Sequence, residues 1–159
     1  RFPCFSVKDV ASTEGVVVPG LVLCEGFMSE EEEEECLRLV DGSEWVEGLA
    51  RRVQHYGYTF DYGIRGIDFK KPQIPMPPLL KAIGERAHGK GLVPFVPDQL
   101  TVNEYLPGKG ITSHVDTHSA FEDGILSVTL AAHTVMEFRR PTKAPPEQAP
   151  AREGEALGG

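Results

Sequence analysis

The first clear hydrophobic pattern in the chain predicts a helix that starts after Ser29. Ser29 precedes Glu32 by three residues, the spacing of a capping box in which each side chain accepts from a backbone donor at the helix start. The apolar residues that follow share one helical face: Cys36, Leu37 and Val40. Residues Glu30 to Glu35 lie near the positive end of the helix dipole, which indicates a solvated helix start rather than an acidic interaction tail.

A second helix is predicted after a proline-rich connector at residues 72–78. Pro77 and Pro78 suit its first turn, because the backbone donors there have no partner inside the helix. The apolar residues that follow recur at helical spacing: Leu79, Leu80, Ile83 and Ala87. Gly89 and Gly91 are typical of a helix end, so the helix is expected to span the residues between these prolines and glycines.

The other regular segments favour strands, because they alternate in polarity or are rich in β-favouring residues. They are residues 16–27 with a break at Pro19-Gly20, 51–62 as one strand or a hairpin arm, 99–106, 111–116, 125–130 and 134–138. Helices come early and strands cluster late with tight turns between them. We therefore predict a mostly β protein with flanking helices (α+β), a sandwich or jelly roll rather than a βαβ fold.

Length and composition indicate one domain with loose ends. The chain has 159 residues, which is typical of a single hydrophobic core. Residues 1–15 show no period and are expected to form a loose lead-in, and residues 16–140 form the predicted domain. Residues 141–159 are rich in Pro, Ala and Gly and have little to bury, so we expect a disordered tail.

Charge, apolar runs and cysteines exclude few partners. The formal net charge is −8, without a basic excess, although Arg51/Arg52 and Lys70/Lys71 could still contact phosphate. No apolar run is long enough for a membrane span, and no leader pattern follows Arg1. Three cysteines without a C-x-x-C pair are read as idle thiols in a reducing compartment. We expect a soluble protein of the cytoplasm, with the nucleus as the alternative.

The strongest candidate for chemistry is the His114-Val115-Asp116 motif. On an extended strand, residues i and i+2 point the same way, so the imidazole and the carboxylate can meet at one ion. This is two thirds of the 2-His-1-carboxylate set that binds non-heme Fe(II). Asn103 and Tyr105 share a face of the preceding segment, and their amide and phenol suit an organic acid that chelates metal. The alternative is an exposed strand end with ordinary polar residues.

Several stretches resemble one known family, the AlkB-type Fe(II)/2-oxoglutarate-dependent dioxygenases. They are DQLTVNEYLPGKGI at 98–111, HVDTHSAFED at 114–123, SVTL at 127–130 and VMEF at 135–138. RRVQHYGY at 51–58 resembles a segment of the branch that acts on tRNA wobble uridines. The resemblance covers residues 16–140 and implies a double-stranded β-helix, here incomplete. It further implies Fe(II) held by His114 and Asp116, and 2-oxoglutarate contacted by Asn103 and Tyr105.

The same resemblance implies a second metal histidine and two arginines beyond Asp116. Residues 141–159 contain no His and only Arg152, which indicates a C-terminal truncation. His118 and His133 are weaker ligand candidates. For His118, a position beside a ligand or at the surface is favoured, and for His133 a position in a surface loop. His55 is read as a substrate-side or partly buried aromatic, and His88 as a helix C-terminal residue.

Four residues are candidates for RNA contact: Arg51, Arg52, Tyr56 and Tyr58. The alternative is that the tyrosines pack at the core edge and the arginines face water, and both interpretations stay open. The resemblance implies RNA, in particular tRNA, as the partner of a monomeric chain, with a methyltransferase as a further candidate partner and no membrane.

Three functional hypotheses follow. The first is an oxygenase that hydroxylates or demethylates a modified nucleobase in RNA, in particular a tRNA wobble uridine. The second is a truncated, non-catalytic AlkB-like fragment that binds RNA or a partner without turnover, because one His and one Asp make an incomplete metal shell. The third is an oxygenase of proteins or small molecules, which would not need Arg51 or Arg52.

Overall fold

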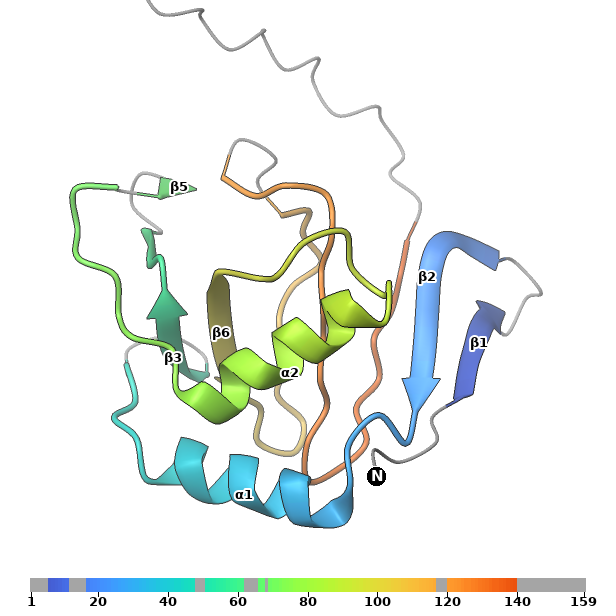
Figure 1. Cartoon of the computed structure of the whole chain (residues 1–159), viewed down its shortest axis with the longest axis horizontal. Coiled ribbons are helices and arrows are strands. Elements are labelled where there is room, and N and C mark those ends of the chain that lie inside the picture. Colours follow the sequence, from blue (N-terminus) through green and yellow to red (C-terminus); the bar gives the residue numbers. More distant parts are fainter. Residues whose placement is uncertain are drawn as a thin grey trace, which may run out of the picture. The chain divides into compact units, whose positions relative to one another are not determined.

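The computed structural model of the protein describes residues 6–11, 17–47, 51–61, 66–67, 69–116 and 120–139. Its elements are β1 (Ser6–Ala11), β2 (Val17–Glu25), α1 (Glu30–Asp41), β3 (Arg52–Gly57), β4 (Phe60–Asp61), β5 (Gly66–Ile67), α2 (Pro78–Gly89) and β6 (Gln99–Glu104), shown in Figure 1. The chain divides into two compact units, Arg1–Ser6 with Cys24–His133 and Val7–Leu23 with Thr134–Gly159. All candidate site residues belong to the first unit.

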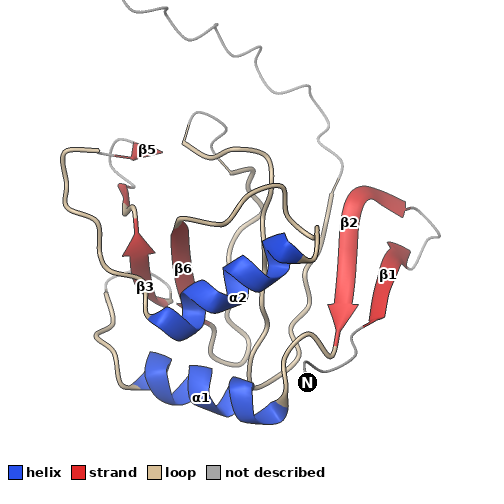
Figure 2. Cartoon of the chain, in the orientation of Figure 1, coloured by secondary structure: helices blue, strands red, loops and turns tan. Residues whose placement is uncertain are grey.

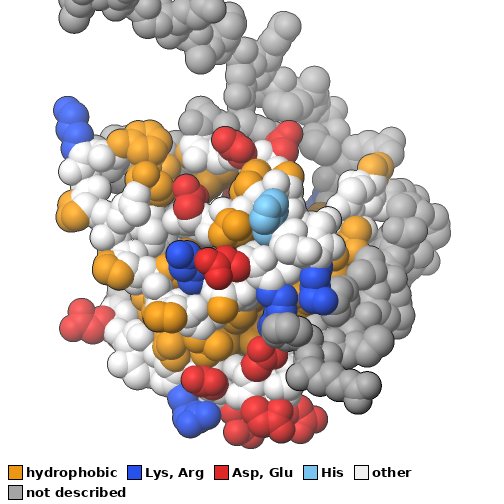
Figure 3. Space-filling model, in the orientation of Figure 1, with side chains coloured by type: hydrophobic (Ala, Val, Ile, Leu, Met, Phe, Trp, Pro, Cys, Tyr) orange, Lys and Arg blue, Asp and Glu red, His pale blue; other side chains and the backbone are white. Residues whose placement is uncertain are grey.

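Helix α1 begins as the capping box predicts. The Ser29 hydroxyl accepts from the Glu32 backbone amide at 3.2 Å, and the Ser29 amide donates to Glu32 Oε2 at 3.0 Å. Cys36 and Val40 from the predicted apolar stripe are buried. In the acidic first turn, Glu30 and Glu31 are exposed whereas Glu32 and Glu33 are half-buried, and Figure 3 shows acidic side chains gathered over this end of α1, at the bottom of the view. The prediction of this helix is confirmed.

Helix α2 also follows its prediction, with proline in its first turn and Ile83 and Ala87 buried. Gly84 lies against Pro97, since an added Cβ would stand 3.2 Å from the proline Cδ. Arg86 joins the two helices because its Nη1 donates to Glu32 Oε1 at 2.7 Å. The same guanidinium lies 4.6 Å from the centre of the Phe27 ring.

An antiparallel pair of strands, β3 and β6, carries most of the candidate site residues. Figure 2 shows these two strands in red, with α2 drawn in front of them. The register places Arg52 opposite Glu104, His55 opposite Thr101, and Gly57 opposite Gln99. The strand predicted at residues 99–106 is present as Gln99–Glu104, but the burial of its residues does not alternate, since all of them except Asn103 are half-buried.

The core lies between this pair and the helices. Gln54 of β3 donates through Nε2 to the Val40 carbonyl oxygen at 2.7 Å and so binds the last turn of α1. The buried apolar residues among those described are Cys36, Val40, Val53, Tyr56, Ile83, Ala87 and Val93. Of the described helices, none is long and apolar enough to cross a membrane.

Three predicted strands are absent from the structure. Residues 111–116, 125–130 and 134–138 are described, and none of them forms a strand. A β-strand requires a neighbouring strand to complete its backbone hydrogen bonds, and within the described residues β6 pairs with β3 alone. The strand-like sequences of these segments were therefore not sufficient to predict strands. The helices and small antiparallel sheets make the protein α+β, whereas the double-stranded β-helix stays a prediction.

Two further boundaries differ from expectation. β1 lies inside the predicted loose lead-in and pairs with β2. β2 continues through Pro19 and Gly20 instead of breaking there, because an edge strand tolerates proline and Gly20 takes a positive φ of 78°. The segment at 51–62 contains two strands, β3 and β4, and residue 62 lies outside the described residues. The tail at 141–159 also lies outside them.

Candidate metal and co-substrate site

His114 and Asp116 converge although no strand holds them. The His114 Nε2 atom lies 3.6 Å from Asp116 Oδ1, and the two side chains are 51% and 50% exposed. Two donor atoms this close together could be ligands of the same metal ion. Imidazole nitrogen and carboxylate oxygen are also the donor types that non-heme Fe(II) accepts. The two residues lie close enough to be ligands of one metal ion, and the metal site itself stays a prediction.

A backbone contact indicates which ring nitrogen of His114 carries a proton. Its Nδ1 atom lies 2.8 Å from the Thr112 carbonyl oxygen. Because a carbonyl oxygen only accepts hydrogen bonds, Nδ1 carries the proton in this contact. In the neutral ring, Nε2 then has a free lone pair beside Asp116. A metal-binding histidine needs this arrangement, with one nitrogen donating to the protein and the other facing the ion.

The described residues contain no group of three side chains that could hold a metal ion. His118, one of the further ligand candidates, lies outside the described residues. His133 is exposed and lines a hollow with Glu33 and residues 129–132. His88 is bound through Nδ1 to the Val93 carbonyl oxygen at 3.2 Å, near the end of α2.

Asn103, predicted to contact 2-oxoglutarate, is exposed on β6 and is held by Arg51. Arg51 Nε donates to Asn103 Oδ1 at 2.6 Å. This contact assigns the amide oxygen to Arg51 and leaves the amide NH2 group to donate elsewhere. Tyr105 follows one residue after the end of β6 and is exposed. Arg51, one of the candidates for RNA contact, therefore contacts a residue predicted to bind the co-substrate.

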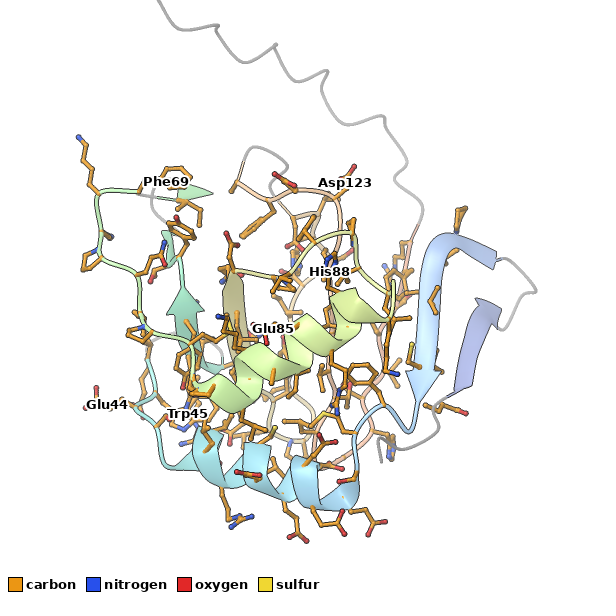
Figure 4. The ribbon with its side chains drawn as sticks, in the orientation of Figure 1. Glu44, Trp45, Phe69, Glu85, His88 and Asp123 are labelled. Atoms are coloured by element: carbon orange, nitrogen blue, oxygen red, sulfur yellow. The ribbon has the colours of Figure 1, made fainter. Side chains whose placement is uncertain are left out.

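Arg52 is engaged in a different set of contacts. Its Nε and Nη2 atoms donate to the two carboxylate oxygens of Glu104 at 2.5 and 2.7 Å. Its guanidinium also lies 4.5 Å from the centre of the ring of Trp45, which Figure 4 labels. The hydrogen bond from Arg52 lowers the pKa of Glu104, and the same bond raises the pKa of Arg52. Through its hydrogen bonds to Glu104, Arg52 links β3 to β6.

The two tyrosines differ in exposure. Tyr56 is only 8% exposed and its hydroxyl donates to Gln54 Oε1 at 3.0 Å, so the core-edge interpretation fits it better than base stacking. Tyr58 is partly exposed, and its ring makes an edge-on contact with Phe69. Stacking on RNA is therefore sterically open to Tyr58 but not to Tyr56 as it lies.

A polar row runs beside Asn103 on the same face of β6. His55 is buried, and its Nδ1 lies 3.1 Å from Thr101 Oγ1. Gln99 Nε2 donates to the same Thr101 oxygen at 2.8 Å. Burial lowers the pKa of His55, and the positive charge of Arg51 lowers it further. Gln99 was missed as a member of this row, although the alternation that grouped Thr101 with Asn103 extends to it.

Comparison with known protein sequences shows the family of this chain. No family model matches it. The chain is 46% identical over 128 residues to the "Alkylated DNA repair protein ALKBH8 homolog" of Arabidopsis thaliana, an alignment that covers 77% of this chain and 37% of that protein. It is 29% identical over 132 residues to the "Alpha-ketoglutarate-dependent dioxygenase alkB homolog 4" of Homo sapiens, covering 77% of this chain and 41% of that protein. The chain therefore belongs to the AlkB family.

Within that family, the similarity is high to proteins that carry the ALKBH8 name. The chain is 42% identical over 141 residues to "tRNA (carboxymethyluridine(34)-5-O)-methyltransferase alkbh8" of Xenopus tropicalis, covering 85% of this chain and 22% of that protein. The resemblance inferred from residues 98–111 and 114–123 is thus confirmed. The chain spans 37% of the Arabidopsis protein's length and 22% of the Xenopus protein's length.

Proposed function

We propose that the chain belongs to an Fe(II)- and 2-oxoglutarate-dependent oxygenase that oxidises a modified nucleobase in RNA, in particular a tRNA wobble uridine. The observation that carries this proposal is the convergence of His114 Nε2 and Asp116 Oδ1, with His114 Nδ1 held by a backbone carbonyl. The printed names of relatives support the class, since one is an α-ketoglutarate-dependent dioxygenase and another acts on uridine 34 of tRNA.

In this proposal, His114 and Asp116 hold Fe(II), which supplies the reactivity toward O2 that protein side chains lack. Asn103 and Tyr105 bind 2-oxoglutarate. The amide NH2 of Asn103 and the phenol of Tyr105 are hydrogen-bond donors, and a carboxylate accepts from both. Arg51 orients Asn103, because its hydrogen bond to Oδ1 fixes which end of the amide is available.

RNA fits as the substrate because a modified base reaches a protein site only when it is unpaired. Single-stranded loops are the usual targets of sequence-specific RNA recognition, and their bases stack on aromatic side chains. Tyr58 and Arg51 are partly exposed on the segment that the resemblance assigns to RNA contact. The wobble position is the particular base proposed, by similarity to the relatives named for uridine 34.

A second candidate function is RNA binding without turnover. In the part of the chain that the structure describes, two candidate ligands meet rather than three. Metal affinity depends on the number and type of ligands, so a chain with an incomplete set would bind Fe(II) weakly. Such a chain could still bind RNA, because the partly exposed Tyr58 and Arg51 do not depend on the metal.

Succinate release separates the two candidates. The chain is incubated with Fe(II), 2-oxoglutarate, O2 and an anticodon stem-loop that carries a modified wobble uridine. We expect succinate release that requires Fe(II) and RNA and that disappears in His114→Ala. The matched control is His88→Ala, at an exposed histidine of α2, in which succinate release should persist. RNA binding with no succinate from the unsubstituted chain would instead favour the non-catalytic function.

A further inference from the structure

The polar row on β6 extends away from the predicted co-substrate residue Asn103. Thr101 and Gln99 come two and four residues before Asn103, and side chains at this spacing share one face of a strand. At about 3.3 Å per residue, the row covers roughly 13 Å from Asn103 to Gln99. Gln54 belongs to the other face, because it is paired with Val102, and it donates to α1. The polar row therefore lies on the face of the strand pair that points away from α1.

The position across from Gln99 holds no side chain. Gln99 is paired with Gly57. Gly57 takes a positive φ of 73°, and a Cβ there would lie 1.9 Å from the Asp98 carbonyl oxygen, so a larger residue does not fit. Tyr58 follows Gly57 and is partly exposed. A base that stacks on Tyr58 therefore lies at the same end of the strand pair as Gln99.

One contact holds the amide of Gln99 and leaves the rest of the amide unused. Nε2 donates to Thr101 Oγ1 at 2.8 Å. A side-chain amide offers two donor protons and one acceptor oxygen. Within the described residues, neither Oε1 nor the second Nε2 proton of Gln99 has a hydrogen-bond partner. The half-buried side chain of Gln99 therefore presents one donor and one acceptor side by side.

Thr101 is in turn held from the opposite strand. Its Oγ1 lies 3.1 Å from Nδ1 of His55, which is buried. Burial and the charge of Arg51 lower the pKa of His55, so the imidazole is neutral near pH 7 and can accept at Nδ1. A hydroxyl that donates its proton to Nδ1 is left as an acceptor only. Such an acceptor binds the NH2 end of the Gln99 amide and fixes which end is which.

We propose that Gln99 selects the reacting base by binding the imide edge of a uracil. This edge carries an N–H donor beside a carbonyl oxygen, which is the complement of the acceptor and donor that Gln99 presents. When a uracil is modified at one of its C–H carbons, the imide edge lies on the opposite side of the ring. A base whose modified carbon points toward the co-substrate at Asn103 therefore turns its imide edge toward Gln99. The inference rests on the proposed function, because it names the residue that selects the base in that reaction.

Binding of matched anticodon stem-loops tests this inference. Three RNAs differ only at the wobble base, which is a modified uridine, the same uridine methylated at N3, or cytidine. Because the rest of each stem-loop is identical, the ratio of two affinities reports the contact to that base alone. Fluorescence anisotropy with the metal-free chain should show the uridine stem-loop bound about 5- to 150-fold more tightly than either of the others.

Substitution of Gln99 separates recognition of the base from a structural role. Gln99→Met keeps the length of the side chain and removes the amide, so both affinity ratios should fall to about one. A role limited to the packing of β6 would instead change the affinity for all three RNAs equally. The matched control is Gln73→Met, the same change at an exposed glutamine, which should keep both ratios.

A second variant tests the support of the amide. Thr101→Val keeps the shape of the side chain and removes the hydroxyl that orients Gln99, so both ratios should fall at least about twofold. Circular dichroism shows whether each variant is folded. If Gln99→Met does not fold, the ratios in Thr101→Val decide the question, and unchanged ratios there would overturn the proposal.

The remaining outcomes also decide. Equal affinity of the unsubstituted chain for all three RNAs, or the same ratios in folded Gln99→Met, would overturn the assignment of Gln99 and leave the oxygenase proposal standing if succinate is released. Preference for uridine that depends on Gln99 in a chain that releases no succinate would support the assignment and reject turnover. No binding of any stem-loop would reject the assignment together with RNA as the substrate.

Discussion

Arg51, the residue before β3, donates a 2.6 Å hydrogen bond through Nε to Oδ1 of Asn103 on the paired strand β6. This contact joins a candidate for RNA contact with a residue predicted to contact 2-oxoglutarate. It gives Arg51 a positioning role, because rotation of the Asn103 amide would exchange its acceptor and donor ends.

We predict that Arg51→Ala weakens binding of 2-oxoglutarate about 2- to 13-fold, the equivalent of one hydrogen bond. Isothermal titration with 2-oxoglutarate in the presence of Fe(II) measures this affinity. Arg38→Ala, at an exposed arginine of α1, is the matched control and should have no effect. Loss of RNA affinity with 2-oxoglutarate affinity unchanged would return Arg51 to the role of an RNA contact.

His55 is predicted to be neutral near pH 7. Burial lowers the pKa of this imidazole, and the nearby positive charge of Arg51 adds to the effect. A histidine with a lowered pKa in the folded state contributes stability above its unfolded pKa, and that contribution is lost as the pH falls through the folded pKa. An NMR titration should therefore find a pKa below the ordinary histidine value, and Arg51→Ala should raise it part of the way back. A titration at the ordinary value would contradict the burial of the ring.

The Arg52–Glu104 pair should make stability depend on acid pH. The hydrogen bond from Arg52 lowers the pKa of Glu104, so the folded state holds this proton less tightly than the unfolded state. The stabilisation is present above the unfolded pKa and is lost as the pH falls through the lower, folded pKa. Thermal unfolding followed across the acid range should show a shallower decline in Glu104→Gln than in the unsubstituted chain. Identical curves would mean that this pair adds no stability.

Glu32 should be the most important residue of the acidic run. It caps the start of α1 and accepts a hydrogen bond from Arg86, whose side chain is only 10% exposed. Because hydrogen bonds to charged groups are worth about 1.5–3 kcal/mol, we expect Glu32→Ala to lower the free energy of unfolding by about that amount. Urea unfolding measures it, and Glu35→Ala, at an exposed residue of the same helix, should change it by less than about 0.5 kcal/mol. Equal effects of the two substitutions would mean that the pattern of contacts around Glu32 is not what stabilises α1.

Features that depend on nearby residues could be predicted from sequence. The capping box at Ser29 and the extended conformation of residues 99–104 are local, and both are present in the structure. The convergence of His114 and Asp116 spans only two residues and was also predicted. The two side chains lie close together in an irregular segment. The i, i+2 spacing therefore predicted their proximity, although the strand assumed for it is absent.

Features that depend on register could not be predicted. Arg51 and Asn103 are 52 residues apart, and only the pairing of β3 with β6 brings them together. The segments at 111–116, 125–130 and 134–138 have strand-like sequences, yet whether such a segment becomes a strand depends on a partner elsewhere in the chain. Sequence also could not separate Tyr56 from Tyr58, because the burial of Tyr56 depends on residues that pack around β3 in the folded chain.

Anaerobic titration with Fe(II) tests the metal site most directly. If His114 and Asp116 hold the ion, then His114→Ala and Asp116→Asn should each weaken Fe(II) binding at least about tenfold, because removing a ligand costs no less than removing a group that supports one. His88→Ala and Glu122→Gln, at an exposed histidine and an exposed carboxylate elsewhere, should bind Fe(II) like the unsubstituted chain. Fe(II) affinity that is the same in all five proteins would contradict the assignment of this pair as the metal site.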